Sequence, residues 1–134
     1  MDVFDIEKRS AVMRAVKSKD TTPEMKVRRL LHRAGYRFRL HHKDLPGKPD
    51  LVFPGKRAAI LIHGCFWHQH PSCRHADRPS SNNPYWDKKL NRNVERDKAN
   101  VSALEEKGWR VLVLWECEIR NSDPLWMIKT FLDD

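Results

Sequence analysis

The chain has 134 residues, enough for one domain with a hydrophobic core but too few for two. Hydrophobic residues make up 40% and charged residues 33%, a globular balance that argues against wholesale disorder. No apolar run reaches the roughly 18 residues that a membrane span needs, and the N-terminus carries no apolar segment of signal-peptide type. We therefore expect one cytoplasmic domain over residues 1–134.

The net charge of +8 is unevenly distributed along the chain. Residues 1–43 contain twelve lysines and arginines but only five acidic residues. Such a segment favours a polyanionic partner, because each phosphate that it neutralises releases counterions. A solvated basic helix explains the charge equally well, so charge alone leaves both interpretations open.

Two helices are predicted within this basic segment. Residues 7–19 have helical composition. Thr22, Pro23 and Glu24 then predict the start of a second helix, with Thr22 as the N-cap and Glu24 favoured by the helix dipole. This helix is expected to stop at Gly35.

The remainder of the chain alternates between strands and helices. The expected elements are strands at 36–40, 51–53 and 58–62, a helix from Asn83 to near Gly108, a buried strand at 109–115, and a closing amphipathic helix that begins after Asp123. Residues 63–82 have no period and collect His, Cys, Pro and Ser, which predicts an irregular loop rich in potential ligands. This order indicates an α/β fold.

Three cysteines and a histidine are spaced like the ligands of a metal ion. Cys65, His70 and Cys73 lie in the irregular loop, and Cys117 follows at the end of a distant strand. An odd number of cysteines without a secretion signal favours metal ligation or burial over disulfides. Thiolates with an imidazole suit tetrahedral zinc, and four protein ligands make a structural site. Two alternatives stay open: Cys117 as a core residue, and His75 as the fourth ligand.

A candidate for a second metal lies elsewhere. Asp50 follows Pro49 at the start of a short strand, and the next strand ends at Ile62-His63. A carboxylate at one strand end, beside a neighbouring strand end, can hold a hard cation together with a backbone carbonyl. Magnesium bound in this way takes further ligands from substrate phosphates. The motif is weak by itself, because Pro-Asp in a loop is usually only a turn.

The long predicted helix carries an acid on its inward face. Asp97 lies on or beside the apolar stripe formed by residues such as Leu90 and Val94. An inward carboxylate is costly unless it is paired, and His63 and His68 are the nearest candidates. A partly hydrated Asp97 at the edge of the stripe is equally consistent with helical spacing.

Three aromatic side chains stand beside these polar groups. Phe66 and Trp67 are adjacent in the loop, and Trp86 lies at the start of the long helix. Apolar side chains on a rigid support can wedge between base steps of DNA. Ordinary packing against the loop is the default explanation for any one of them.

Four blocks of sequence together resemble the Vsr family of very-short-patch-repair endonucleases. They are residues 62–68 (IHGCFWH) with Cys73, residues 45–50 (LPGKPD), residues 93–97 (NVERD), and residues 108–117 (GWRVLVLWEC). They occur in family order and at family spacing, over about Ser10 to Cys117. The resemblance implies a restriction-endonuclease-like fold, a mixed β-sheet flanked by helices with a zinc-stapled loop.

The resemblance also implies an activity. Such an enzyme nicks one DNA strand on the 5′ side of the T in a T·G mismatch that arises from deaminated 5-methylcytosine. Hydrolysis of the phosphodiester would depend on magnesium and leave a 3′-hydroxyl and a 5′-phosphate. The expected partners are mismatched duplex DNA, mismatch-repair helper proteins and a cognate 5-methylcytosine methyltransferase, in the cytoplasm near the nucleoid.

Catalytic roles follow by the same resemblance. Asp50 matches the magnesium-binding aspartate, and Ile62 takes a position usually held by Thr, whose backbone carbonyl reaches the metal. His68 matches the general base. His63 and Asp97 match its supporting catalytic pair, and Glu24 matches an acidic residue near the waters bound to the metal. Ile62-His63-Gly64 stands where the superfamily usually has acid-x-Lys, which favours a histidine base.

The resemblance assigns the remaining sites as well. The matching zinc ligands are Cys65, His70, Cys73 and Cys117. Gln69 and the Pro71-Ser72 insertion depart from the family's run of histidines. The matching mismatch wedge is Phe66, Trp67 and Trp86. Within a basic DNA-contacting segment at residues 1–20, Met13 matches a residue that enters the opposite groove, and we expect Arg14 and Lys17 to contact DNA.

Two other classes of protein remain compatible with the sequence. One is a non-catalytic, zinc-stapled DNA-binding module in which Asp50 and His68 are structural. The other is a sequence-specific restriction nuclease that cuts intact duplex. Supercoiled plasmid distinguishes these two classes from a mismatch endonuclease. A DNA-binding module would leave the plasmid unchanged, a mismatch endonuclease would nick it slowly, and a restriction nuclease would cut it into discrete fragments.

Overall fold

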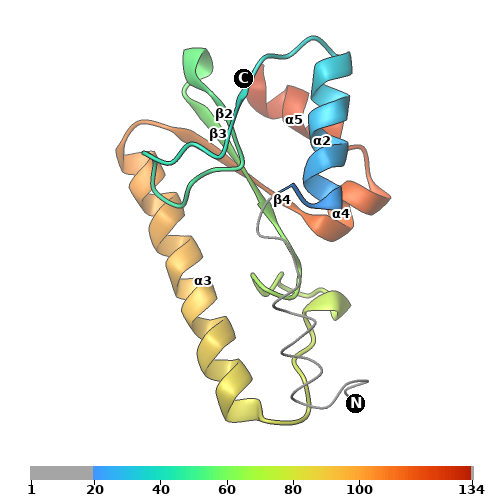
Figure 1. Ribbon diagram of the computed structural model, residues 1–134, viewed down its shortest axis with the longest axis vertical. Helices are drawn as coiled ribbons and strands as arrows, with labels where there is room; N and C mark the ends of the chain where they lie inside the picture. The colour runs from blue at the N-terminus through green and yellow to red at the C-terminus, as the bar shows by residue number, and fades with distance from the viewer. Residues whose placement is uncertain (1–19, 134) are drawn as a thin grey trace.

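A computed structural model describes residues 20–133 as a four-stranded sheet with helices on both faces (Figure 1). Its elements are α2 (Thr22–Arg33), β1 (Arg39–Leu40), β2 (Leu51–Phe53), η1 (Pro54–Lys56), β3 (Ala58–His63), η2 (Arg74–Ala76), α3 (Asn83–Glu106), β4 (Arg110–Trp115), α4 (Glu116–Asn121) and α5 (Pro124–Leu132). The predicted basic helix at 7–19, with Met13, Arg14 and Lys17, lies outside the described residues. No helix within residues 20–133 has the length and hydropathy to cross a membrane.

The sheet is mixed, as the resemblance implied. Its strand order is β1-β2-β3-β4, with antiparallel pairing from β1 to β3 and parallel pairing of β3 with β4. The parallel register runs from Ala58 opposite Arg110 to His63 opposite Trp115, and α3 forms the crossover. The start of β2 and the C-terminal ends of β3 and β4 therefore lie at the same end of the sheet.

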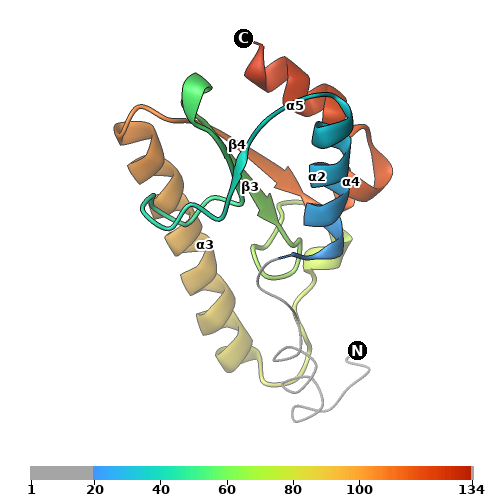
Figure 2. The same cartoon turned by 45° about the horizontal axis from the view of Figure 1, so that its top comes forward.

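Helices cover the two faces unequally. α3 lies along one face, and α2, α4 and α5 pack together on the other (Figures 1 and 2). The largest cluster of buried apolar residues lies beneath the group of three helices and includes Val27, Leu31, Leu51, Phe53, Ile60, Leu114, Ile119, Ile128 and Leu132. Burial of these side chains is the main favourable contribution to folding. On α3, the buried side chains are Trp86, Leu90 and Leu104.

The helix start differs by one residue from the prediction. The N-cap of α2 is Thr21, whose hydroxyl accepts a hydrogen bond from the Glu24 amide at 3.4 Å, and Thr22 is already helical. Cap preference cannot choose between two adjacent threonines, because both have the same hydroxyl chemistry.

Two predicted strands differ in extent or burial. The strand expected at 36–40 is reduced to Arg39–Leu40, because only Leu51 and Val52 of β2 pair with it. Tyr36 and Phe38 still pack on the core, with ring centroids 6.4 and 6.1 Å from that of Phe53. The strand expected to be buried at 109–115 is the edge strand β4, where only Leu114 is fully buried.

One helix was missed. α4 follows β4 without an intervening turn, so Cys117 lies in the first turn of a helix rather than at a strand end. No Gly, Pro or Asn marks this junction. It is instead stabilised by the carboxylate of Glu118, which accepts a hydrogen bond from the Trp115 amide at 3.1 Å, and by complete burial of Ile119.

Candidate active site and metal centre

The predicted catalytic residues meet at the end of the sheet where β2 begins and β3 ends. Four of them, Asp50, His63, His68 and Asp97, line a cavity of about 500 Å³ together with Ile62, whereas Glu24 is not part of its wall. Asp50 comes from the start of β2, His63 from the end of β3, His68 from the following loop and Asp97 from α3. Side chains from next to β2, from β3 and its following loop, and from α3 thus contribute to one concave polar surface, the usual setting of a catalytic site.

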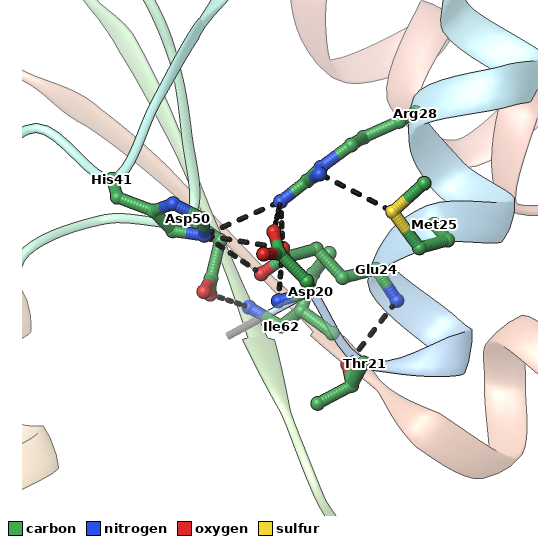
Figure 3. A network of polar contacts seen from close by, with 8 residues as sticks. All are labelled: Asp20, Thr21, Glu24, Met25, Arg28, His41, Asp50 and Ile62. Atoms are coloured by element: carbon green, nitrogen blue, oxygen red, sulfur yellow. Dashed lines mark hydrogen bonds and ion pairs between the residues drawn. The ribbon is translucent and has the colours of Figure 1, made fainter. Parts of the chain in front are cut away.

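Asp50 has an orientation suited to a hard cation. Its Oδ2 accepts a hydrogen bond from the Ile62 amide at 2.7 Å (Figure 3). Burial raises the pKa of Asp50 to about 7 against the lowering effect of this hydrogen bond, and Glu24 raises the pKa further. Two carboxylates held close together away from water repel one another, and a divalent cation would relieve that repulsion. The donor set therefore fits magnesium, which prefers oxygen ligands.

Glu24 is buried at 2% exposure in a network of polar contacts (Figure 3). Its carboxylate accepts a hydrogen bond from the Asp20 amide at 2.9 Å, forms an ion pair with Arg28, and lies 3.1 Å from Nε2 of His41. The His41 amide in turn donates to the carbonyl of Asp50 at 3.1 Å. The network thus connects α2 with the residues that flank β1 and β2, and it fixes Glu24 beside Asp50.

Arg28 and His41 are members of this network that the sequence analysis missed. Arg28 had a detectable signal, because it follows Glu24 by four residues on one helix, a spacing that brings side chains together. His41 had none, because its contact with Glu24 depends on how the chain folds back after α2.

Asp97 is paired with a histidine, as the inward face of the helix required. Nδ1 of His68 lies 2.6 Å from Oδ2 of Asp97, and both side chains are partly exposed to solvent. The carboxylate favours the imidazole form that carries its proton on Nδ1, which leaves Nε2 with a free lone pair. That arrangement permits His68 to accept a proton.

His63 completes this group of residues by stacking on His68. Its ring stacks on that of His68 with centroids 3.9 Å apart and planes 8° apart. Burial lowers the pKa of His63 to about 4, and the neighbouring His68 contributes to the lowering. His63 is therefore neutral near pH 7, so it supports the ring of His68 without adding a competing positive charge.

Cys65, His70, Cys73 and Cys117 form a second cluster beside the first. Their ligand atoms all lie within 4.8 Å of one another, and Nδ1 of His70 is 3.7 Å from Sγ of Cys65 and 3.4 Å from Sγ of Cys117. Tetrahedral zinc, with bonds of about 2.0–2.3 Å, would separate its ligand atoms by roughly 3.3–3.8 Å. The donor chemistry and spacing fit zinc. His75, the alternative ligand, is exposed and outside this cluster.

Gln69 has a structural place in the loop that departs from the family pattern. Its amide nitrogen donates to the carbonyls of Phe66 at 2.7 Å and Ala76 at 3.0 Å, and its oxygen accepts from Arg78 at 2.9 Å. The inserted Ser72 adopts a left-handed backbone with φ of 58°. Gln69 therefore holds the loop together from outside the cysteine cluster.

The aromatic residues form one cluster at the start of α3. Ring centroids are 5.3 Å apart for Phe66 and Trp67 and 5.8 Å apart for Phe66 and Trp86. Trp86 is only 3% exposed, whereas Phe66 and Trp67 are half-buried. The buried Trp86 ring therefore supports the two more exposed rings. Tyr85, which the sequence analysis did not single out, is 45% exposed and contacts Trp86 edge-on at 5.0 Å.

The fold is that of a nuclease. The catalytic domain of the homing endonuclease I-Bth0305I is similar over 84% of this chain and 94% of its own length, with a TM-score of 0.57 and 26% identity. Together with the polar cavity at this end of the sheet, this similarity defines the chain as an endonuclease with a restriction-endonuclease-like fold.

Sequence comparison specifies the family. Residues 1–75 match the family described as DNA mismatch endonuclease Vsr. The DNA mismatch endonuclease Vsr of Escherichia coli is 43% identical over 92% of this chain and 79% of its own length. The type II nicking enzyme V.XorIIP of Xanthomonas oryzae pv. oryzae is 52% identical over 92% and 90%, respectively. The chain belongs to the Vsr family, and it is a DNA-nicking endonuclease.

Proposed function

We propose that the protein nicks one strand of duplex DNA on the 5′ side of the T in a T·G mismatch that arises from deaminated 5-methylcytosine. The observation that carries this proposal is the His68–Asp97 pair, which lines the same cavity as Asp50. A carboxylate suited to a hard cation and a histidine suited to accept a proton are the two groups that phosphodiester hydrolysis by an activated water requires. Family membership supports the mismatch as the target.

The positions of these residues support a catalytic role for each. Asp50, with the backbone carbonyl of Ile62, would hold magnesium, which when bound polarises the scissile phosphate and stabilises the leaving oxygen. Nε2 of His68 accepts a proton from the attacking water, while Asp97 orients the ring and stabilises its protonated form. Cleavage at this position leaves a 3′-hydroxyl and a 5′-phosphate.

Two further residues support these groups. His63 fixes the plane of the His68 ring by stacking. Glu24, held by Arg28 and His41, lies beside Asp50 and would accept hydrogen bonds from water near magnesium.

Zinc on Cys65, His70, Cys73 and Cys117 would be structural. Four protein ligands leave no open coordination position for substrate. His68 lies in sequence between two of these ligands, Cys65 and His70. Binding of zinc would therefore hold the loop that carries the proposed base.

The aromatic cluster and the basic N-terminal segment would bind DNA together. We propose that Phe66 and Trp67, supported by Trp86, enter the base stack at the mismatch, and that Met13, with Arg14 and Lys17, approaches from the opposite groove. All of residues 1–134 would form one endonuclease domain. It would act in the cytoplasm near the nucleoid, with a 5-methylcytosine methyltransferase as a functional link and mismatch-repair helper proteins as partners.

Short duplexes test this function directly. The protein should nick a duplex with T·G at one position and leave otherwise identical C·G and T·A duplexes uncut, with magnesium present and not in EDTA. End-labelling of the product then identifies the 3′-hydroxyl and 5′-phosphate. Equal cleavage of all three duplexes would indicate a sequence-specific nuclease instead, and binding without cleavage would indicate a DNA-binding module.

The aromatic cluster gives a prediction about selectivity. Trp67→Ala should reduce the preference for T·G over C·G duplex more than it reduces binding to matched DNA. Insertion costs unstacking, that cost is lowest at a mismatch, and the wedge thereby converts weak pairing into preference. The measurement is the ratio of dissociation constants on the two duplexes in magnesium-free buffer without chelator.

A second tryptophan provides the control for this experiment. Trp126 on α5 is 65% exposed and lies outside the aromatic cluster, so Trp126→Ala should leave the ratio unchanged. Equal losses of affinity on both duplexes in Trp67→Ala would mean that Trp67 serves only to pack the loop.

A further inference from the structure

Two basic side chains in the wall of the cavity have no role in the site described so far. Lys43 and Lys48 line the same cavity as Asp50 and His68. Within residues 20–133, neither lysine forms an ion pair with a carboxylate. Hydrolysis of a phosphodiester places additional negative charge on the phosphate oxygens in the transition state, and a cation that faces them stabilises that charge. An unpaired ammonium group in this cavity is suited to that purpose.

Lys48 differs from Lys43 in how firmly its backbone is held. Its φ is +46°, in the left-handed region that costs free energy for residues with a Cβ. The Lys48 amide donates to the carbonyl of Leu45 at 3.1 Å, which closes a turn. The following residue, Pro49, is fully buried and leads directly into Asp50.

The backbone of the preceding residue, Gly47, is also held in place by packing. Gly47 has φ of +73°, and a Cβ added to it would lie 2.9 Å from Cβ of Asn100 on α3. The turn at Gly47 is therefore packed against α3 with no room for a side chain. Because packing fixes both flanks of Lys48, its strained conformation is imposed by the fold. Strain of this kind persists at positions where the surrounding structure determines it, often at functional sites.

We propose that Lys48 contacts the scissile phosphate and stabilises the charge that develops on it during cleavage. The proposal rests on the hydrolysis proposed above for Asp50 and His68. The Lys48 ammonium donates hydrogen bonds to a non-bridging phosphate oxygen, while His68 takes the proton from water. Lys48 is assigned in preference to Lys43 because it lies two residues from Asp50 on a backbone that cannot adjust independently.

The first test separates chemistry from binding. Lys48→Asn removes the charge but keeps a residue that tolerates a left-handed backbone. Its single-turnover nicking rate at saturating DNA should fall about 100-fold, the effect of losing one electrostatic donor to a transition state. Lys48→Arg should retain most of the rate. Lys56→Asn, in η1 at the opposite end of β2 and β3, makes the same charge change outside the cavity and should have no effect.

The second test needs no catalysis and no magnesium. Duplexes are prepared with the scissile linkage as a phosphate or as an uncharged methylphosphonate, and affinities are measured in magnesium-free buffer without chelator. The affinity ratio, phosphate over methylphosphonate, should be about fivefold lower in Lys48→Asn than in wild type, the effect of one partly exposed ion pair. Lys56→Asn should keep the wild-type ratio.

These outcomes distinguish the inference from the function on which it rests. A Lys48→Asn protein that nicks at the wild-type rate when saturated, or that keeps the wild-type affinity ratio, overturns the assignment of Lys48. A wild-type protein that binds the duplex but never nicks it overturns the proposed function, and the affinity ratio then still reports whether Lys48 contacts that phosphate.

Discussion

Replacement of Asp50 by asparagine should reduce nicking by about 1,000-fold or more, because several kcal/mol of transition-state stabilisation depend on the cation it holds. Asparagine retains an oxygen that can accept the Ile62 amide, but it is a poor ligand for a hard cation. Affinity for T·G duplex in magnesium-free buffer should persist or rise, since one negative charge near the phosphates is gone. Nicking rates and dissociation constants on the same duplex measure both effects.

Folding of the Asp50→Asn protein can be checked independently. Burial and Glu24 make ionised Asp50 unfavourable in the native protein, so its native pKa of about 7 lies above that in the unfolded chain. The unmutated protein therefore loses stability as pH rises from about 4 to 7, and the neutral variant escapes that loss. At about pH 8 in magnesium-free buffer without chelator, Asp50→Asn should melt at or above the wild-type temperature. A lower melting temperature would mean that loss of activity reflects misfolding.

His68→Ala serves as the companion variant. Loss of a general base should cost roughly 100–10,000-fold in rate while metal binding remains largely intact. Excess magnesium should partly rescue Asp50→Asn and not His68→Ala. If both variants nick T·G duplex at the wild-type rate, the proposed catalytic centre is wrong and the chain is better described as a zinc-stapled DNA binder.

Removal of zinc should unfold the protein. We expect one tightly bound zinc per chain, and a structural site of this type contributes on the order of 10 kcal/mol to folding. Cys117→Ser should lower the melting temperature more than it lowers activity per folded molecule, because a closed site supplies folding energy and no open position for chemistry. Thermal melts with and without chelator, together with elemental analysis, measure these effects.

The exposed histidine of the same loop provides a matched control. His75 lies outside the cysteine cluster, so His75→Ala should leave zinc content and melting temperature unchanged. Freshly purified, active protein without zinc would contradict the site. So would a Cys117→Ser protein that melts like wild type.

Features set by chemistry or by periodicity were predictable from sequence. Cys117 was assigned to the cysteine cluster from ligand type alone, and that assignment survived although its local structure is a helix instead of a strand end. Helical spacing placed Asp97 on or beside the inward stripe of α3, with His63 and His68 as candidate partners and a partly hydrated carboxylate as the alternative. The structure contains features of both, because Asp97 pairs with His68 and stays partly exposed.

Features set by tertiary contacts were not predictable. α4 follows β4 without a turn residue, and burial of Ile119 against other elements stabilises it, which no local propensity records. His41 meets Glu24 only because the chain folds back after α2. The left-handed backbone of Lys48 arises from packing of Gly47 against Asn100, a contact across 53 positions of sequence.

The parallel pairing of β3 with β4 has a consequence for biosynthesis. A nascent chain that has emerged as far as α3 already contains Asp50, His68 and Asp97, but β3 still lacks its parallel partner. Cys117 is made later still, 44 residues after Cys73. The strand end that positions His63 and the loop that carries His68 are therefore completed only once β4 and Cys117 have been synthesised. We accordingly expect a ribosome stalled before β4 to display no active nuclease.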